Sequence, residues 1–121
     1  MAEPTAPDRN LVILSGSLSR PPEVRTLPSG DSLVAYEVTS RPADGPALSV
    51  PVTCAAGAAP VDLDVGTEVV VTGVVRRRYF RAGGATQSRT EVVADAVIPA
   101  RQVARARRAV ERALGAAGLP G

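Results

Sequence analysis

The stretch EVVVTGVVRRRYFR, residues 68–81, runs into the turn Ala82-Gly83-Gly84-Ala85 and is followed by a second β-branched run, RTEVVADAV, over residues 89–97. Two such runs on either side of a glycine-containing turn predict a long β-hairpin. The first strand of this hairpin starts apolar and ends with four arginines and two aromatic residues. We expect the chain to fold around this hairpin, and its tip is the first candidate site.

The tip of the hairpin has two different faces, because successive side chains of a strand point to opposite sides. One face carries Arg76, Arg78 and Phe80, and the other carries Arg77, Tyr79 and Arg81. An aromatic ring beside guanidinium groups offers a stacking surface next to phosphate neutralisation, which is the chemistry that binds single-stranded nucleic acid. The alternative is that the arginines only solvate the end of a strand while the rings cap a small core.

Length and composition indicate one domain with a thin core. The chain has 121 residues, of which 45% are hydrophobic and only 2% aromatic, so the core must consist of Val, Ala and Leu. Oligomerisation buries more of such a core, and we expect a homo-oligomer, either a dimer or a tetramer. No stretch approaches the ~20 apolar residues of a membrane span, so no membrane association is expected.

Charge is distributed unevenly along the chain. All 14 basic residues are arginine. Residues 1–64 hold four arginines against eight acids, a net charge of −4, and residues 65–121 hold ten against four, a net charge of +6. A basic half beside an acidic half indicates a surface that faces a polyanion. The alternative is a clustering of arginine codons without functional meaning.

Three shorter strands are predicted before the hairpin, over residues 10–19, 33–39 and 48–54, where apolar and polar residues alternate. Gly16 in the first strand predicts a bulge or a close approach of another backbone. Pro51 in the third predicts an edge or an interrupted ladder. Between the strands, Val24–Leu27 reads as a short extended piece and residues 55–60 as a weak helical turn.

A helix is predicted over residues 100–114, after Pro99 ends the last strand. Its apolar stripe would consist of Val103, Ala106, Val110 and Ala113 or Leu114, with Gly115 as C-cap. The remaining faces are rich in arginine. Such a helix can contact DNA, an acidic partner or a membrane surface, but packing on its own domain or on a sister subunit is the favoured interpretation.

These elements predict an all-β fold, a five-stranded OB-fold Greek-key barrel with a C-terminal α-helix. The expected division is a flexible leader over residues 1–9, the OB-fold domain over 10–98, the basic amphipathic helix over 99–115 and a flexible tail over 116–121. The leader is polar and rich in proline, which is atypical of a signal peptide.

Five stretches along residues 10–98 add a resemblance to this prediction. They are NLVILSGSLSRPPEVR (10–25), PSG (28–30) with LVAY (33–36), VPV (50–52), GTEVVVTG (66–73) and TEVVAD (90–95). In this order they resemble the bacterial single-stranded DNA-binding protein family. The resemblance implies an OB-fold and binding of single-stranded DNA in replication, repair or recombination.

The chain also departs from that family. Phe80 falls on one of the positions where the family stacks bases on aromatic rings, but the other customary positions fall near Asp44, Ser49 and Ala55, none of which can stack a base. At ~1–3 kcal/mol per stacked base, the loss of three rings would weaken binding by orders of magnitude unless arginines compensate. The family's acidic tail is absent, and the basic helix stands in its place.

Residues that most catalytic and metal sites need are missing. The chain has no histidine, no lysine and a single cysteine, Cys54, so imidazole catalysis, a usual zinc site and a phosphate-loop signature are excluded. Asp62 and Asp64 form the only close pair of acids and read as loop residues. We therefore expect neither an enzyme nor a cofactor nor a metal. A lone cysteine suits a reducing cytoplasm.

The sequence thus predicts sequence-independent and weak binding of single-stranded DNA, with RNA as the alternative ligand because a stacking platform accepts either. The candidate binding residues are Phe80, Tyr79, Arg76, Arg77, Arg78, Arg81 and Arg89, with Arg20, Arg25 and Arg41 at the periphery. Because of strand alternation, Arg76 and Arg78 cannot share one groove with Arg77. The rival interpretation is an OB-fold interaction or scaffold module that has lost DNA binding and docks a protein partner through its C-terminal helix.

Overall fold

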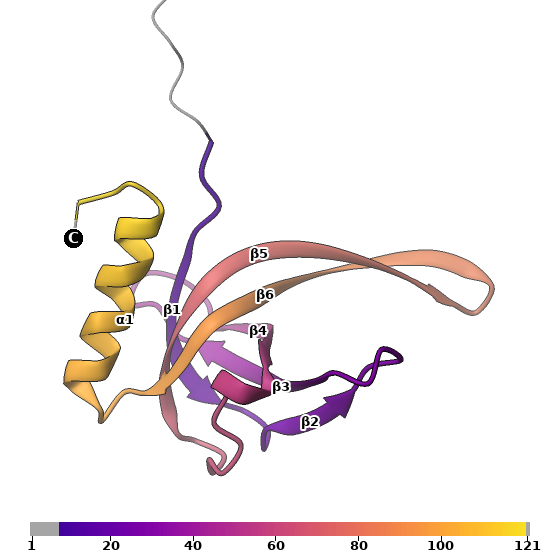
Figure 1. Ribbon diagram of the computed structural model, residues 1–121, viewed down its shortest axis with the longest axis horizontal. Coiled ribbons are helices and arrows are strands. Elements are labelled where there is room, and N and C mark those ends of the chain that lie inside the picture. The colour runs from indigo at the N-terminus through magenta and orange to yellow at the C-terminus, as the bar shows by residue number, and fades with distance from the viewer. Residues whose placement is uncertain (1–7, 121) are drawn as a thin grey trace, which may run out of the picture.

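The computed structural model describes residues 8–120, which form six strands, one short 3-10 turn and one C-terminal helix (Figure 1). The elements are β1 (Val12–Leu18), β2 (Glu23–Thr26), β3 (Ser32–Ser40), β4 (Leu48–Ala55), η1 (Ala56–Ala58), β5 (Glu68–Ala82), β6 (Ala85–Pro99) and α1 (Val103–Ala116). Of the expected leader, residues 1–7 lie outside the described residues, as does Gly121 at the end of the expected tail.

The six strands form one sheet in the order β1-β5-β6-β4-β3-β2. Neighbouring strands are antiparallel, except that β4 and β6 run parallel over Val52–Cys54 and Val92–Ala94. The end of β1 also pairs with β3, where Ser17 faces Thr39 and Leu18 faces Val38. Pro51 faces Glu37 in a β3–β4 ladder that runs without a break, but it precedes Val52, the first residue of β4 that pairs with β6. Of the two predicted alternatives, the pairings therefore agree with an edge at Pro51 and not with an interrupted ladder.

The core lies between the inner faces of these strands and is built from valine, as the composition predicts. Val34, Tyr36 and Val38 point inward from β3 and are almost fully buried, as expected. They pack with Val52 of β4, Val69 and Val71 of β5, and Leu18 of β1 in a single cluster. Alternation of side chains therefore identified the inward face of β3. It failed in part for β4, where Leu48 is exposed and Thr53 is buried beside Val52 and Cys54.

The expectation of five strands is wrong by one. The piece Val24–Leu27, predicted only as extended, forms most of β2 and pairs with β3 from Glu23↔Ala35 to Thr26↔Ser32. The turn that follows it folds the chain back: Gly30 N donates to Leu27 O over 2.9 Å, and Leu27 N donates to Asp31 O over 2.7 Å. All four β2 residues are exposed, so this edge strand carries no burial pattern that the sequence could reveal.

Two glycines allow backbones to pass closely. A Cβ on Gly16 would collide with the carbonyl of Thr39, which confirms the predicted close approach, and one on Gly73 would collide with the carbonyl of Val93. The β5–β6 register shifts at this second glycine, because Gly73 faces Ala94 while Thr72 faces Ala96. Asp95 is the extra residue of this β-bulge, which the sequence did not predict.

Helix α1 begins at Val103 rather than at residue 100 and extends to Ala116. It packs Ala106 and Ala109 onto Ile98, with Val70 and Ala96 beside them, which confirms packing on its own domain. Val103 is 60% exposed, so its expected place in the apolar stripe is wrong, and Ala109 lies there instead. No segment of helix in residues 8–120 has the length and apolarity needed to cross a membrane.

The helix ends two residues later than expected, at Ala116 in place of Leu114. Gly118, with φ of 75°, is the left-handed glycine that ends the helix, a role that was predicted for Gly115. Gly118 N donates to Gly115 O over 3.0 Å and Leu119 N to Leu114 O over 2.8 Å, the two hydrogen bonds of a Schellman motif. The first residues of the expected flexible tail are therefore part of the helix and its cap.

Candidate nucleic-acid interface

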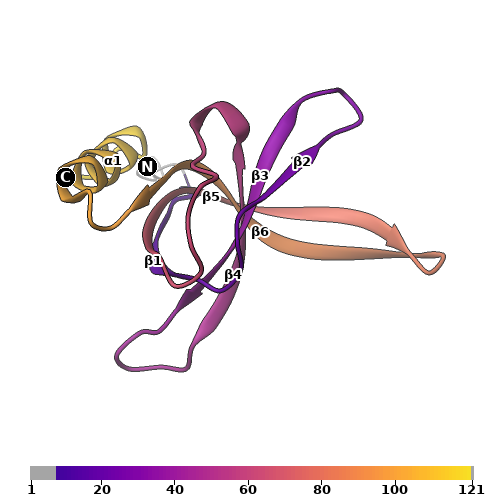
Figure 2. The same ribbon diagram turned by 90° about the horizontal axis from the view of Figure 1, so that it is seen from below.

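The hairpin of β5 and β6 leaves the sheet as a two-stranded arm, defined here as residues 76–91. Pairing of β1 with β5 ends at Gly73, and β4 pairs with β6 only over residues 92–94, so the arm strands pair with each other alone. The arm projects on the side of the sheet opposite to α1 (Figures 1 and 2). Its two turn residues, Gly83 and Gly84, have φ of 59° and 80°, the positive values that a tight hairpin turn requires.

Asn10 fixes the base of the arm. Its side-chain Nδ2 donates to the carbonyl of Val75 over 2.8 Å, and the amide of Val75 donates to its Oδ1 over 2.8 Å. One side chain thus continues the ladder beyond the last backbone pair of β1 and β5. Sequence reasoning missed this residue, since a single asparagine before a strand carries no distinctive pattern.

A groove runs beneath one face of the arm and is called here the arm groove. One part is a cleft of about 690 Å³ between the arm and the β2–β3 hairpin, lined by Arg76 and Arg78 on one side and by Leu27, Leu33 and Ala55 on the other. A narrower part continues toward Arg89, with Arg20 and Arg25 on the far side. Five of the ten predicted site residues therefore converge on one groove: Arg76, Arg78, Arg89, Arg20 and Arg25.

A buried carboxylate lies at the base of this groove. Glu91 is only 4% exposed and faces Arg76 across the hairpin. Its Oε1 lies 3.4 Å from Arg76 Nη2 and 3.7 Å from Arg78 Nε, and its Oε2 accepts a hydrogen bond of 3.4 Å from Thr53 Oγ1. Glu91 thus neutralises part of the charge of two candidate arginines and holds their side chains along the groove.

Arg78 and Arg89 form a like-charged pair across the arm. They face each other directly in the β5–β6 register, an arrangement that destabilises a hairpin in the absence of a counterion. Arg78 reaches Glu91 at 3.7 Å, but Arg89 has no ion pair within residues 8–120. This pair concentrates positive charge at a point where the groove is open to solvent.

The two peripheral arginines of the groove have acidic neighbours. Arg25 Nε lies 3.1 Å from Glu23 Oε1 on β2, and Arg20 Nε lies 3.7 Å from Glu37 Oε2 on β3. These pairs are exposed and contribute little to stability. They reduce the positive charge of the groove rim, so the excess positive charge is concentrated on the arm.

Phe80 lies on the same face of the arm as Arg78 and faces Gln87 across it. Its side chain is 36% exposed, which leaves part of the ring accessible. A ring beside two arginines can stack a base while the guanidiniums contact phosphates. Of the three residues that the sequence resemblance aligns with stacking rings, Ala55 lines the arm groove but has no ring, and Asp44 and Ser49 are exposed on the β3–β4 segment.

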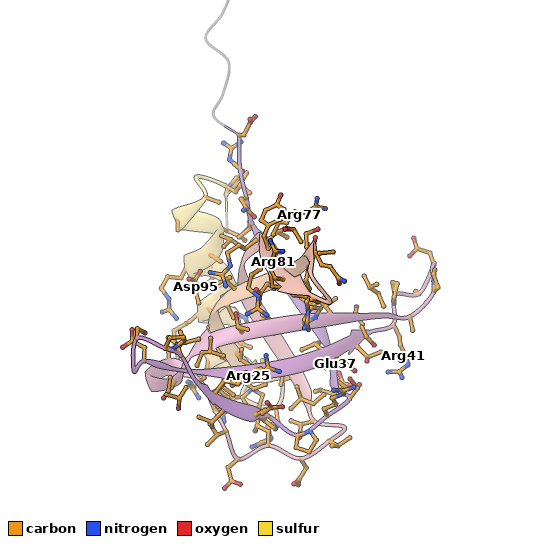
Figure 3. All side chains as sticks on the ribbon, turned by 90° about the vertical axis from the view of Figure 1, so that its right-hand side faces the viewer. Arg25, Glu37, Arg41, Arg77, Arg81 and Asp95 are labelled. Atoms are coloured by element: carbon orange, nitrogen blue, oxygen red, sulfur yellow. The ribbon has the colours of Figure 1, made fainter. Side chains whose placement is uncertain are left out.

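The opposite face of the arm carries Arg77, Tyr79 and Arg81, as alternation predicted. Tyr79 is 67% exposed, and Arg81 Nη2 donates to Gly84 O over 3.0 Å within the turn. Figure 3 looks along the arm and shows Arg77 and Arg81 on it, with Arg25 and Glu37 on the strands below. All three side chains of this face are exposed, whereas the other face lines the arm groove, so the two faces offer different binding surfaces.

Arg41 is separate from both faces. It lies in the β3–β4 connection, where its Nη1 donates to Ser17 Oγ over 3.4 Å and its side chain lines a small cleft with Thr39 and Glu68. Figure 3 shows it on a different part of the molecule from the arm. The structure therefore does not bring Arg41 into the arm groove.

Two titratable side chains behind the groove are buried in the core. Burial raises the pKa of the Tyr36 phenol and also that of the Cys54 thiol, so both stay protonated at neutral pH. The Tyr36 hydroxyl donates to the carbonyl of Pro60 over 2.5 Å and thereby ties the β4–β5 connection to the sheet. Within residues 8–120, no cluster of three or more acids, histidines or cysteines could hold a metal ion.

Glu91 is the important residue that sequence reasoning missed, although a signal for it existed. Counting outward from a two-residue turn at Gly83-Gly84 pairs Ala82 with Ala85 and, six residues further, Arg76 with Glu91.

The comparisons with known proteins add nothing to these residues: no protein-family model matches the chain, and no curated protein sequence matches it significantly.

Proposed function

We propose that this chain is an OB-fold module that binds single-stranded DNA in the arm groove, without reading the bases. The strand pairings support a barrel, because they pass from β1 through β5, β6, β4 and β3 and then return to β1. A small Greek-key barrel with a positive groove across its strands is a common design for binding single strands. Function here depends on the groove and not on the fold alone.

The observation that carries the proposal is the like-charged pair of Arg78 and Arg89 beside a partly exposed Phe80. Two guanidiniums that face each other on an isolated two-stranded arm repel, and a phosphate placed between them would remove the repulsion. The ring next to them can stack a base of the same strand. The acids along the groove and the scarcity of rings make the binding weak.

The proposal is tested by fluorescence anisotropy with labelled oligo-dT at low and moderate salt. We expect binding that weakens steeply as salt is added, because arginine–phosphate contacts release counterions. Phe80→Ala should weaken binding about five- to a hundredfold, the equivalent of one lost stack of ~1–3 kcal/mol. Tyr79→Ala removes a ring from the opposite face of the arm and is the matched control, with a smaller expected effect.

Two results would contradict the proposal. Absence of oligo-dT binding at low salt would exclude a nucleic-acid function for the groove. Equal losses from Phe80→Ala and Tyr79→Ala would show that the groove face is not the binding face. Repeating the titration with oligo-U separates DNA from RNA, which the stacking chemistry alone does not distinguish.

The second candidate function is an interaction or scaffold module without nucleic-acid binding. The observation that favours it is Glu91, which engages Arg76 and Arg78 and leaves less charge for phosphates. In that case the arm, whose strands have unpaired edges, would pair with a strand of another chain. The oligo-dT titration at low salt discriminates the two candidates.

A further inference from the structure

A second groove lies next to helix α1 and is called here the helix groove. It is a cleft of about 700 Å³ between α1, the end of β6 and the connection that follows η1. Its wall on the helix side carries four arginines, namely Arg101, Arg105, Arg108 and Arg112. The arm projects from the other side of the sheet (Figure 1). Of the described residues that line the two grooves, they share only Gly57, where they meet.

The arginines form one stripe because of helical geometry. Arg105, Arg108 and Arg112 are three and four residues apart, so they share one face of α1 and are separated by about 4.5 and 6 Å along its axis. Arg101 continues the stripe from the turn before the helix. The buried residues Ala106 and Ala109 occupy the neighbouring face, so the stripe borders the sheet.

The charge of this stripe is uncompensated within residues 8–120. None of its four arginines forms an ion pair there, and Arg105 donates a hydrogen bond to the side-chain oxygen of Gln102. Among the described residues that line the groove, the one acid is Asp95, the extra residue of the β-bulge, which is labelled in Figure 3. Four guanidiniums against one carboxylate form a site for an anionic ligand.

The opposite wall and the floor indicate which anion would fit. They are apolar, with Ala59, Pro60 and Leu63 from the β4–β5 connection and Ile98 from β6, and no aromatic residue lines the groove. A nucleic acid would find phosphate contacts but no ring for its bases. A peptide can place carboxylates on the arginines and apolar side chains on the floor at the same time.

We propose that the helix groove binds an acidic peptide segment of a partner protein. An extended peptide repeats its side-chain direction every ~6.6 Å, which is close to the step of about 6 Å from Arg108 to Arg112 and longer than the step of about 4.5 Å from Arg105 to Arg108. Alternating acidic and apolar residues would therefore contact the arginines and the apolar floor in turn. Guanidinium forks bind carboxylates in a bidentate manner, so binding depends on acid groups and weakens with salt.

The test uses the full chain and a labelled synthetic peptide of alternating aspartate and valine, with an asparagine–valine peptide as the neutral probe. Only the acidic peptide is expected to bind. Arg108→Glu puts a carboxylate between Arg105 and Arg112 and should weaken binding at least about tenfold, ~1.4 kcal/mol. Arg107→Glu makes the same change of charge on the neighbouring residue, outside the groove, and should change binding less than about twofold.

Three results would overturn the proposal. The first is equal binding of the acidic and the neutral peptide. The second is an equal loss of peptide affinity in Arg107→Glu and Arg108→Glu. The third is a loss of oligo-dT binding in Arg108→Glu in the absence of any peptide binding, which would assign the groove to nucleic acid. Circular dichroism verifies that each variant is folded, and Arg112→Gln is a milder second variant that is also expected to weaken peptide binding. The peptide titrations do not depend on whether the arm groove binds DNA.

Discussion

Single side chains decide how much charge the arm groove presents, and Glu91 is the main one. Replacing it by glutamine removes the acid that faces Arg76 and Arg78 but keeps a hydrogen-bond acceptor for Thr53. We expect Glu91→Gln to tighten oligo-dT binding about threefold at low salt, since two guanidiniums lose their counterion. The free energy of unfolding should fall by only about 1 kcal/mol, because both guanidiniums are half exposed and screened.

Glu23→Gln is the control for this change, because it removes an exposed acid from the rim of the same groove. We expect a smaller gain of affinity from it. Weaker oligo-dT binding by Glu91→Gln would instead mean that Glu91 supports binding by positioning the arginine side chains, and that this effect outweighs the positive charge it neutralises. Anisotropy titrations and urea unfolding measure the two effects separately.

Gly16 is a second residue whose role can be tested directly. Gly16→Ala places a methyl group against the carbonyl of Thr39, where backbone cannot give way easily. We expect a loss of about 1–3 kcal/mol in urea unfolding, as for other overpacked sites. Gly115→Ala fills open space within a helix and should have the opposite sign, a gain of up to ~1 kcal/mol. Equal effects of the two changes would refute the close approach at Gly16.

Some of these residue roles could be predicted from the sequence and others could not. Gly16 was identified because a glycine in an alternating strand needs a reason, and Val34, Tyr36 and Val38 because alternation fixes the face. Gly73 was not identified, since it lies in a run of valines where either face could be buried. The position of Glu91 opposite Arg76 can be counted from the turn, but its burial cannot, because that depends on side chains from β4 and the arm.

At the scale of elements, the arm depends on its attachment, because a two-stranded ribbon is marginally stable alone. Asn10 provides two hydrogen bonds to Val75 at the point where the sheet ends. We expect Asn10→Ala to lower the free energy of unfolding by about 1–2 kcal/mol and to speed hydrogen exchange of the arm amides. Asn10→Asp keeps one of the two hydrogen bonds and should be intermediate. Unchanged exchange in Asn10→Ala would show that the arm does not need this attachment.

Elements with a regular pattern were predicted best. The long hairpin, the strands β1, β3 and β4 and the helix all follow from periodicity, within a few residues at their ends. The edge strand β2 was not predicted as a strand, because all its residues are exposed and its pairing is decided by the turn and not by burial. The helix boundary shifted because the chain first makes a turn after Pro99, in which Gln102 N donates to Pro99 O over 3.0 Å.

For the whole molecule, an unusual composition makes its alkaline stability simple to interpret. The chain has no lysine, so Cys54, Tyr36 and Tyr79 are its only side chains of the types that titrate between pH 8 and 11. Two of the three are buried behind the arm groove and pack in the same core cluster. Their protonation should therefore be linked to the folding of the entire domain.

Burial raises the pKa of Tyr36 and of Cys54 above their ordinary values of 10.0 and 9.0, so the folded state keeps protons that the unfolded state loses. This contribution to stability is fully present below pH 8. It begins to decline as the pH passes 9 for Cys54 and 10 for Tyr36, at up to ~1.4 kcal/mol per pH unit for each group, and the decline continues toward the raised pKa of the folded state. Urea unfolding between pH 7 and 11 measures the decline. Cys54→Ala should remove its earlier part and Tyr36→Phe its later part, whereas Tyr79→Phe, which alters an exposed phenol, should keep it. A decline that persists unchanged in Tyr36→Phe and Cys54→Ala would show that the core is not its cause.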